Sequence, residues 1–337
     1  MRKRIILLSI VLSLSILLSG CGLNLKAEGD INPKPDKIDY VKNNDNKAGT
    51  VPRELYLLDA SGHLSPQVVN LPKSTSSAKD TLNYLVKDGP VSNILPNGFM
   101  AVLPADTMVN NTSLKKDGTF VVDFSKDLLS YRPSDEAVIF QSITWTLTQF
   151  KEIKRVQFKV DGKIQDQLKF SGKRMGRGLI RKDGINSELG QAIDMTRSQS
   201  VTVYYLAHHH GQHYYVPVTT RVPLSKDGAA AAAVNALIEG PPDDHLTSTL
   251  GVDVALTKAP VIKNGVAILH FNKALFSSNK KKSVSREAIN CLALTLTGQP
   301  NIKKVKINVE GSKSVMLDSG EPLTVPVSRP VVNKTGV

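Results

Sequence analysis

The sequence predicts an α+β protein built from two tandem copies of one unit, each with the element order β(β)αββαβ. Three observations predict this fold class. An internal repeat recurs at a spacing of about 149 residues, strand-like and helix-like periodicities alternate within each copy, and 337 residues suffice for two cores. Two helices that each bury one face imply a small sheet that is covered on one side.

The repeat keeps its order from one end of each copy to the other. The offset between equivalent residues stays between 147 and 151, which chance would not preserve. The matched segments are 55–58 with 203–206, 85–90 with 236–241, 122–126 with 269–273, and 156–162 with 305–311.

Strands are predicted where apolar and β-branched residues form short runs between turn signals. In the first copy, Gly62 marks a hairpin turn, and Asp117 with Gly118 marks a second turn. The predicted strands cover Glu54–Asp59, Leu64–Leu71, Met100–Met108, Thr119–Phe124 and Arg155–Asp161.

Two amphipathic helices are predicted in each copy. In the first copy, Ser77 and Asp80 suit a capping box at the start of the first helix, Gly89 and Pro90 end it, and the second helix begins near Ser134. The apolar stripes are Ala78, Leu82, Leu85 and Val86, then Ile139, Phe140, Ile143, Leu147 and Phe150; in the second copy they are Ala229, Ala233, Ala236 and Leu237, then Ala288, Ile289, Leu292 and Leu296.

Residues 1–20 are predicted to be a lipoprotein signal peptide. A basic n-region precedes an apolar run that is short for a membrane span, and the run ends in Leu18-Ser19-Gly20-Cys21, which resembles a bacterial lipobox. Cys21 is therefore the predicted lipidation site, an ordinary signal peptide with a chance cysteine being the alternative. The polar residues 21–52 predict a flexible tether with a reach of about 30 Å.

The net charge of +13 is unevenly distributed. We divide the rest of the chain into a first unit (53–171), a basic connector (172–199), a second unit (200–315) and a tail (316–337). The connector and second unit together carry +9, which suits an acidic protein surface or an anionic wall polymer, although solvated loops are the alternative. The candidate interaction surface consists of Lys280, Lys281, Lys282, Lys303, Lys304, Arg177, Arg181 and Lys182.

Motifs for catalysis or cofactor binding are absent from the sequence: it contains no phosphate-binding glycine loop, no GxSxG and no HExxH. Asp59, Asp123 and Asp161 do not recur as a set in the second copy, so we interpret them as solvated strand-end residues. His208, His209, His210 and His213 fall at a predicted hairpin tip, for which a solvated tip, adventitious metal binding and a functional site are the three readings. We expect no catalytic residue, no metal site, no cofactor and no nucleic-acid partner. Cys291 is predicted to be a small packing residue.

Four features of the first copy resemble the GerMN domain of bacterial sporulation and germination lipoproteins. They are the helix end at 85–90, the Leu95-Pro96-Asn97-Gly98 turn, the Asp117-Gly118 turn and the strand 121–125. The resemblance covers about 53–171 and 200–315. The second copy departs from it where Leu250-Gly251 replaces Pro-x-Gly and His270-Phe271-Asn272 replaces Asp-Phe-Ser.

The resemblance implies a ring-building-motif-like fold and a lipid-anchored protein on the extracytoplasmic face of the mother-cell membrane, facing the space between mother cell and forespore. It also implies that the partners are extracytoplasmic domains of sporulation channel proteins of the SpoIIIA–SpoIIQ type, for which the chain would be a non-enzymatic structural component or localisation factor. The alternative is a lipoprotein that binds peptidoglycan or remodels the cortex. A ligand-binding subunit of a germinant system is a third hypothesis, for which the sequence offers no pocket signature.

Overall fold

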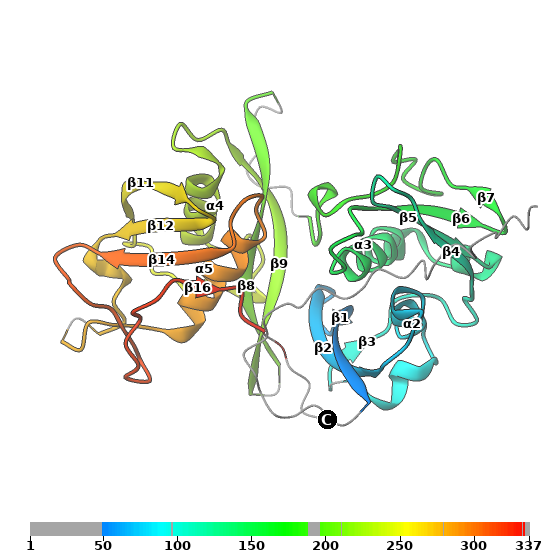
Figure 1. Ribbon diagram of the computed structural model, residues 1–337, viewed down its shortest axis with the longest axis horizontal. Coiled ribbons are helices and arrows are strands. Elements are labelled where there is room, and N and C mark those ends of the chain that lie inside the picture. Colours follow the sequence, from blue (N-terminus) through cyan, green and yellow to red (C-terminus); the bar gives the residue numbers. More distant parts are fainter. Residues whose placement is uncertain are drawn as a thin grey trace, which may run out of the picture. The chain divides into compact units, whose positions relative to one another are not determined.

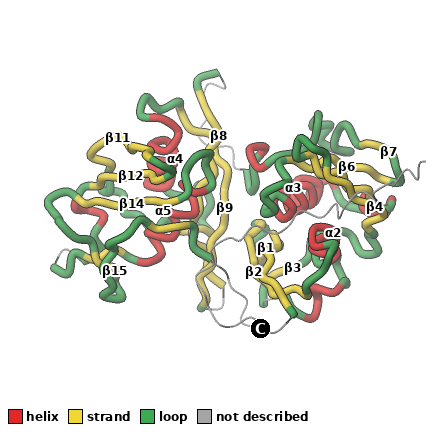
Figure 2. The backbone as a smooth tube through the Cα atoms, viewed as in Figure 1, coloured by secondary structure: helices red, strands yellow, loops and turns green. Residues whose placement is uncertain are grey.

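The computed structural model describes residues 49–95, 97–187, 196–209, 211–278, 280–331 and 333. The predicted signal peptide, Cys21 and most of the predicted tether lie outside the described residues. The described residues form two tandem units of helices and small sheets (Figures 1 and 2), so the predicted α+β class is confirmed.

The first unit contains two sheets. Its hairpin sheet has the order β2-β1-β3, with Leu58 opposite Leu64 across the turn, and its second sheet has the order β4-β5-β6-β7. The elements are β1 (Thr50–Asp59), β2 (Leu64–Pro72), α2 (Ser77–Asn83), β3 (Phe99–Met100), β4 (Val109–Leu114), β5 (Thr119–Phe124), α3 (Glu136–Leu147), β6 (Arg155–Val160) and β7 (Lys163–Ile164).

The second unit repeats this plan, with sheets of the order β10-β8-β9 and β11-β12-β14-β16 and a separate pair of β13 with β15. The elements are β8 (Ser198–His209), β9 (Gln212–Pro223), α4 (Gly228–Glu239), β10 (Leu246–Thr247), β11 (Leu256–Lys263), β12 (Val266–Phe271), β13 (Ser283–Val284), α5 (Arg286–Thr297), β14 (Lys304–Val309), β15 (Met316–Leu317) and β16 (Val327–Ser328).

Each unit is centred on one parallel crossover. β5 and β6 pair in parallel and are joined through α3, and β12 and β14 pair in parallel and are joined through α5. The helices lie between the two sheets of their unit, since α3 contacts β1 as well as β6, and α5 contacts β8 as well as β14. The expectation that each helix buries only one face was therefore wrong for α3, which buries nine of its twelve residues.

Two local predictions in the first unit were wrong. The strand expected over Met100–Met108 is interrupted because Pro104 begins a turn in which Asp106 takes a φ of 64°, and the next strand begins only at Val109. The first helix ends at Asn83 because the Leu85 carbonyl accepts from the backbone N–H groups of 102 and 103, which takes that segment out of the helix while leaving Leu85 buried.

The predicted capping box at Ser77 and Asp80 does not form. The helix is capped at Ser76 without a side-chain hydrogen bond, and the Asp80 carboxylate accepts from the Ser74 hydroxyl instead. The sequence pattern placed the helix start one residue late because the segment Ser74-Thr75-Ser76-Ser77 offers several equivalent caps.

Side chains of α3 complete the hydrogen bonding of β1. The Ser142 hydroxyl donates to the Tyr56 carbonyl (2.6 Å), and the Thr146 hydroxyl accepts from the Tyr56 N–H (3.1 Å). Just after the end of α3, the Gln149 amide both donates to the Glu54 carbonyl (2.8 Å) and accepts from the Glu54 N–H (3.0 Å). The second unit keeps one of these bonds, from the Tyr204 N–H to the Thr295 hydroxyl (3.0 Å). The helix therefore satisfies strand backbone groups that a neighbouring strand would otherwise bond.

We expect Thr146→Val to lower the free energy of unfolding by about 1–2 kcal/mol, because an isosteric valine leaves the buried Tyr56 N–H without an acceptor. Denaturant unfolding followed by fluorescence of Trp145, the only tryptophan of the chain, measures this change. Thr144→Val is the matched control, since its hydroxyl bonds only the Phe140 carbonyl within the same helix. Equal losses in the two variants would contradict the role given to Thr146.

The two units pack on each other through their hairpins, with β2 against β9. The Asn186 amide donates to the carbonyls of Leu64 (2.7 Å) and Pro217 (2.8 Å) and accepts from the Leu64 N–H (2.8 Å). The Tyr214 hydroxyl donates to the Asp59 carboxylate (2.9 Å) across the same junction. One continuous cluster of buried apolar side chains runs through both units.

Each folded unit extends beyond the residues that repeat within the sequence. The segment predicted as a connector contains three buried side chains, Met175, Leu179 and Ile185. Leu179 forms an isolated antiparallel β-bridge with Val156 of β6. In the predicted tail, β15 and β16 pair with strands of the second unit. The described parts of both segments therefore belong to the folded body.

Candidate interaction surfaces

The lysine runs predicted as one surface lie at opposite ends of β14. Lys303 and Lys304 stand at its start, where the Lys303 N–H donates to the Gly265 carbonyl (2.7 Å). Lys280, Lys281 and Lys282 come after the other end of the neighbouring strand β12, where the Lys282 carbonyl accepts from the Met316 N–H (3.1 Å). Six residues of strand span about 20 Å, so these two lysine runs form two separate surfaces.

The basic residues of the predicted connector also do not all lie on one exposed surface. Arg177 and Lys182 are exposed on the first unit. Arg181 is half-buried, donates to the Thr148 hydroxyl (2.8 Å) and the Trp145 carbonyl (3.0 Å), and lies 4.6 Å from the centre of the Trp145 ring. We therefore correct the assignment of Arg181, because its guanidinium is used within the fold and holds the connector on α3.

A cationic surface that the sequence prediction largely missed lies on the four-stranded sheet of the second unit. Strand registers place Lys258 and Lys263 of β11, Val266, Ile268 and His270 of β12, and Lys304 and Lys306 of β14 on the same sheet face, together with the exposed Val261. We call this set the lysine face. The opposite face carries Ala267, Leu269 and Phe271 in the core, and α4 and α5 cover it (Figure 1).

The lysine face carries unbalanced charge. All four lysines are exposed, and among the residues that the structure describes none of them forms an ion pair. The signal for this face in the sequence is the strict alternation of Lys304, Val305, Lys306 and Ile307, which places both lysines on one side of a strand. The runs of lysine in the sequence include Lys304 but not Lys258 and Lys263 of β11, which is separated from β14 by β12.

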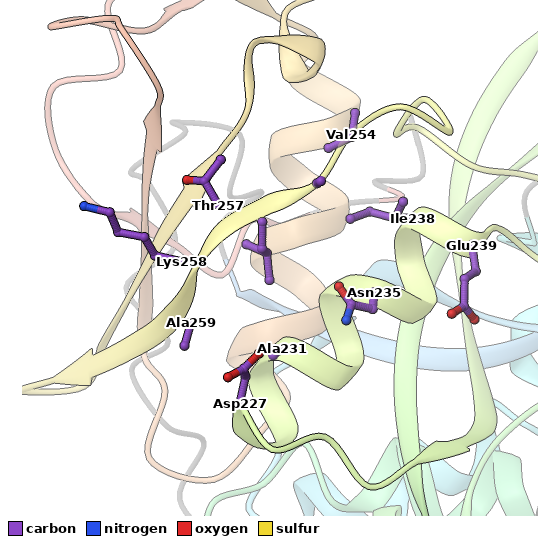
Figure 3. A pocket seen from close by; sticks show the side chains of 11 residues that line it. Asp227, Ala231, Asn235, Ile238, Glu239, Val254, Thr257, Lys258 and Ala259 are labelled. Carbon is purple, nitrogen blue, oxygen red and sulfur yellow. The ribbon is translucent and has the colours of Figure 1, made fainter.

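A groove of about 420 Å³ separates α4 from β11, the edge strand of the same sheet (Figure 3). Ala231, Asn235 and Ile238 line it from the helix, while Lys258 extends away from the helix in this view. The titratable side chains that line the groove are Asp227, Glu239 and Lys258. Among the described residues, no ion pair joins any two of these three side chains.

Two of the predicted strand-end carboxylates, Asp59 and Asp123, accept hydrogen bonds from the backbone, and the expectation that Asp59 is solvated was wrong. Asp59 is buried and accepts from the N–H groups of Ser61 (2.9 Å) and His63 (2.8 Å), in addition to the Tyr214 hydroxyl. Asp123 accepts from the Gly162 N–H (2.9 Å). Asp59 therefore organises the β1–β2 turn and the junction between the units.

The histidine-rich segment lies at the β8–β9 hairpin tip, as the sequence predicts. His208 and His213 are opposite each other with ring centres 4.8 Å apart, while His210 lies outside the described residues. Within the described ranges, the structure contains no group of three or more potential metal ligands. In the same ranges, no helix has the length and apolarity of a membrane span.

Cys291 lies inside α5 with no exposed surface, and burial raises the pKa of its thiol to about 12. Because only the thiolate is reactive, we expect a thiol reagent to label Cys291 at neutral pH only after the protein is unfolded. Ellman's reagent applied with and without concentrated guanidinium checks this expectation. Labelling of the native protein at the rate of free cysteine would show that the thiol is accessible.

The two repeated sheet–helix–sheet units define a class of protein built from tandem α+β domains. The chain belongs to the sporulation and spore germination family (Germane), which matches residues 54–166 and 202–315. It is similar over almost its whole length to spore germination protein GerM of Bacillus subtilis (strain 168), with 42% identity over 96% of each chain. The predicted resemblance to tandem GerMN domains is thereby confirmed.

Solved structures agree with this assignment. The tandem GerMN domains of the sporulation protein GerM from Bacillus subtilis superpose with a TM-score of 0.79 and 45% identity, covering 85% of this chain and all of that chain. A more distant relative is lipoprotein LpqB of Cutibacterium acnes, with 26% identity over 32% of this chain and 18% of that protein. The solved GerM chain is described as the tandem GerMN domains, and its whole length is covered by this chain.

Proposed function

We propose that this protein is a non-enzymatic, membrane-anchored sporulation component that holds partner proteins in place between the mother cell and the forespore. The similarity to a spore germination protein over nearly the whole chain is the observation that carries the proposal. The described surfaces support it, because they offer an exposed sheet face and an open sheet edge. Such surfaces suit binding better than bond chemistry.

The proposed partners are the extracytoplasmic domains of a SpoIIIA–SpoIIQ type channel. The test is to delete the gene in its own organism and to follow a fluorescent fusion of the forespore-side channel protein during engulfment. We expect the fusion to spread around the forespore membrane instead of collecting at its assembly site. A deletion strain that sporulates normally with the fusion correctly placed would refute this function.

The proposed location is the extracytoplasmic face of the cell membrane, with a lipid anchor on Cys21. The lipobox-like sequence supports this location, as does the name of the relative LpqB, a lipoprotein. We expect Cys21→Ser to move the protein from the membrane fraction to the soluble fraction and to abolish labelling by a palmitate analogue. Retention of the label on the variant would place the lipid elsewhere.

Binding to peptidoglycan is the second candidate function, and the unpaired lysines of the lysine face favour it because wall polymers are anionic. Sedimentation of the tandem domains with purified murein tests this candidate. Co-sedimentation that salt abolishes, or release of muropeptides, would support it over the first proposal. Protein that stays in the supernatant would exclude it.

A further inference from the structure

The lysine face has a regular layout that suits one kind of occupant. Two columns of lysines, on β11 and β14, flank β12, whose residues on this face are the apolar Val266 and Ile268 and then His270. Since neighbouring strands lie about 4.8 Å apart, the two charged columns are separated by about 10 Å. Lys304 and Lys306 are two residues apart on one strand and therefore about 7 Å apart.

The fold itself does not require this face. The equivalent sheet of the first unit presents Arg155, Gln157 and Lys159 on β6, and there Lys159 lies opposite Asp123 of β5. The second unit has His270 in place of that aspartate, in the register position opposite Asn308. The acidic residues nearest in sequence, Asp253 and Glu310, fall outside β11 and β14. Since like charges on one sheet face repel each other without helping the core, the face is better explained by an external partner.

The dimensions match an α-helix. A helix with its side chains is about 10–12 Å wide, which equals the spacing of the lysine columns. An apolar stripe along such a helix would lie on Val266 and Ile268, and acidic residues on both flanks would reach the lysines. Side chains at i and i+4 of a helix are about 6 Å apart, close to the separation of Lys304 and Lys306. A sheet whose other face already packs on helices would then be covered on both faces.

We propose that the lysine face binds an acidic amphipathic α-helix of a partner protein. The inference rests on the proposed function in one respect, namely that the occupant is a protein. A flexible polyanion would gain nothing from the apolar column, whereas a helix with a matching apolar stripe excludes water from it. Electrostatic complementarity would set the orientation of the helix and accelerate its association.

The test uses the tandem domains, residues 49–337, since the solved GerM chain shows that such a fragment folds. The probe is a fluorescent synthetic helix of about 20 residues, with leucine along one stripe and glutamate on both flanks, its helicity verified by circular dichroism. Comparison probes are the same helix with lysine for glutamate, poly-glutamate of equal charge, and phosphatidylglycerol vesicles. We expect the glutamate helix to bind most tightly, with an affinity that falls as salt is added.

The matched variants separate the lysine face from net charge. Lys304→Glu with Lys306→Glu should weaken binding of the acidic helix by about tenfold or more. Lys280→Glu with Lys281→Glu makes the same change of charge beyond the end of the strand and should leave binding within about twofold. Val261→Ser, at a side chain that is 55% exposed, should weaken binding of the acidic helix without affecting binding of poly-glutamate. Thermal unfolding of each variant confirms that its fold is intact.

Three results would overturn the proposal: equal losses in the two charge-reversal pairs, poly-glutamate binding as tightly as the helix, or preferential binding of the anionic vesicles. Failure here is distinguishable from failure of the proposed function. If the channel protein is misplaced in the deletion strain but the helix does not bind, only the proposal that the lysine face binds a helix is refuted. If the helix binds and the deletion strain is normal, helix binding by the lysine face is supported and the channel role is refuted.

Discussion

Asn186→Ala, at the junction of the two units, is expected to lower the free energy of unfolding by about 3–5 kcal/mol. The variant removes three hydrogen bonds that join Leu64 of β2 to Pro217 of β9, each worth about 1 kcal/mol. Asn186 also has a φ of 44°, a left-handed conformation that costs alanine about 1–2 kcal/mol. Denaturant unfolding followed by circular dichroism measures the loss.

Asn186→Gly separates the two contributions, because glycine takes the left-handed conformation without strain. We expect the glycine variant to recover the strain energy and to keep the loss from the missing amide. Trp145 lies in the first unit, so its fluorescence should report an unfolding transition that precedes the loss of helical signal in both variants. A fully cooperative transition with wild-type stability in the alanine variant would show that the amide does not couple the units.

Glu136→Ala is expected to cost about 3–4 kcal/mol and to release the segment that follows β7. The buried Glu136 carboxylate accepts from the N–H groups of Phe170 (2.7 Å) and Ser171 (2.8 Å) and from the Tyr131 hydroxyl (3.1 Å). Hydrogen bonds to a charged acceptor are worth about 1.5–3 kcal/mol each. The alanine variant removes the carboxylate that accepts from the backbone N–H groups of Phe170 and Ser171. Hydrogen exchange at 170 and 171, together with denaturant unfolding, measures the effect.

Glu136→Gln is the matched control. It keeps the size of the side chain and one acceptor oxygen, so we expect it to lose less than half as much stability as the alanine variant. Glu152→Ala, at an exposed position on the same unit, should have no measurable effect. If the glutamine variant is as unstable as the alanine variant, the charge rather than the geometry of the acceptor holds the segment.

Acid should weaken the same contact. Burial alone would raise the pKa of Glu136, but the hydrogen bonds from Ser171 and Phe170 outweigh it and hold the pKa below the ordinary value for glutamate. A carboxyl whose pKa is depressed in the folded state stabilises the protein above its unfolded pKa and loses that contribution as the pH falls through the folded value. We therefore expect the wild type to lose stability below about pH 4.5 more steeply than Glu136→Gln does.

Local sequence patterns predicted the elements that depend on local chemistry. The hairpin at Gly62, the strand Thr119–Phe124 and the stripe of the second helix agree with β1, β2, β5 and α3 because alternation and turn residues are properties of neighbouring residues. The strand expected over Met100–Met108 failed because the buried run 101–103 bonds to Leu85 instead of a ladder. A short apolar run does not reveal which partner its backbone will find.

The sequence by itself determined the repeat, the α+β class, the family and the location of the positive charge in the second half of the chain. Only the tertiary structure decided which charged residues share a surface. It separated Lys280–Lys282 from Lys304, showed that the Arg181 guanidinium bonds within the fold, and placed Lys258 and Lys263 on the same sheet face as Lys304 and Lys306. The physical reason is that charge runs are local, whereas a sheet face is assembled from alternate residues of strands that are far apart in the chain.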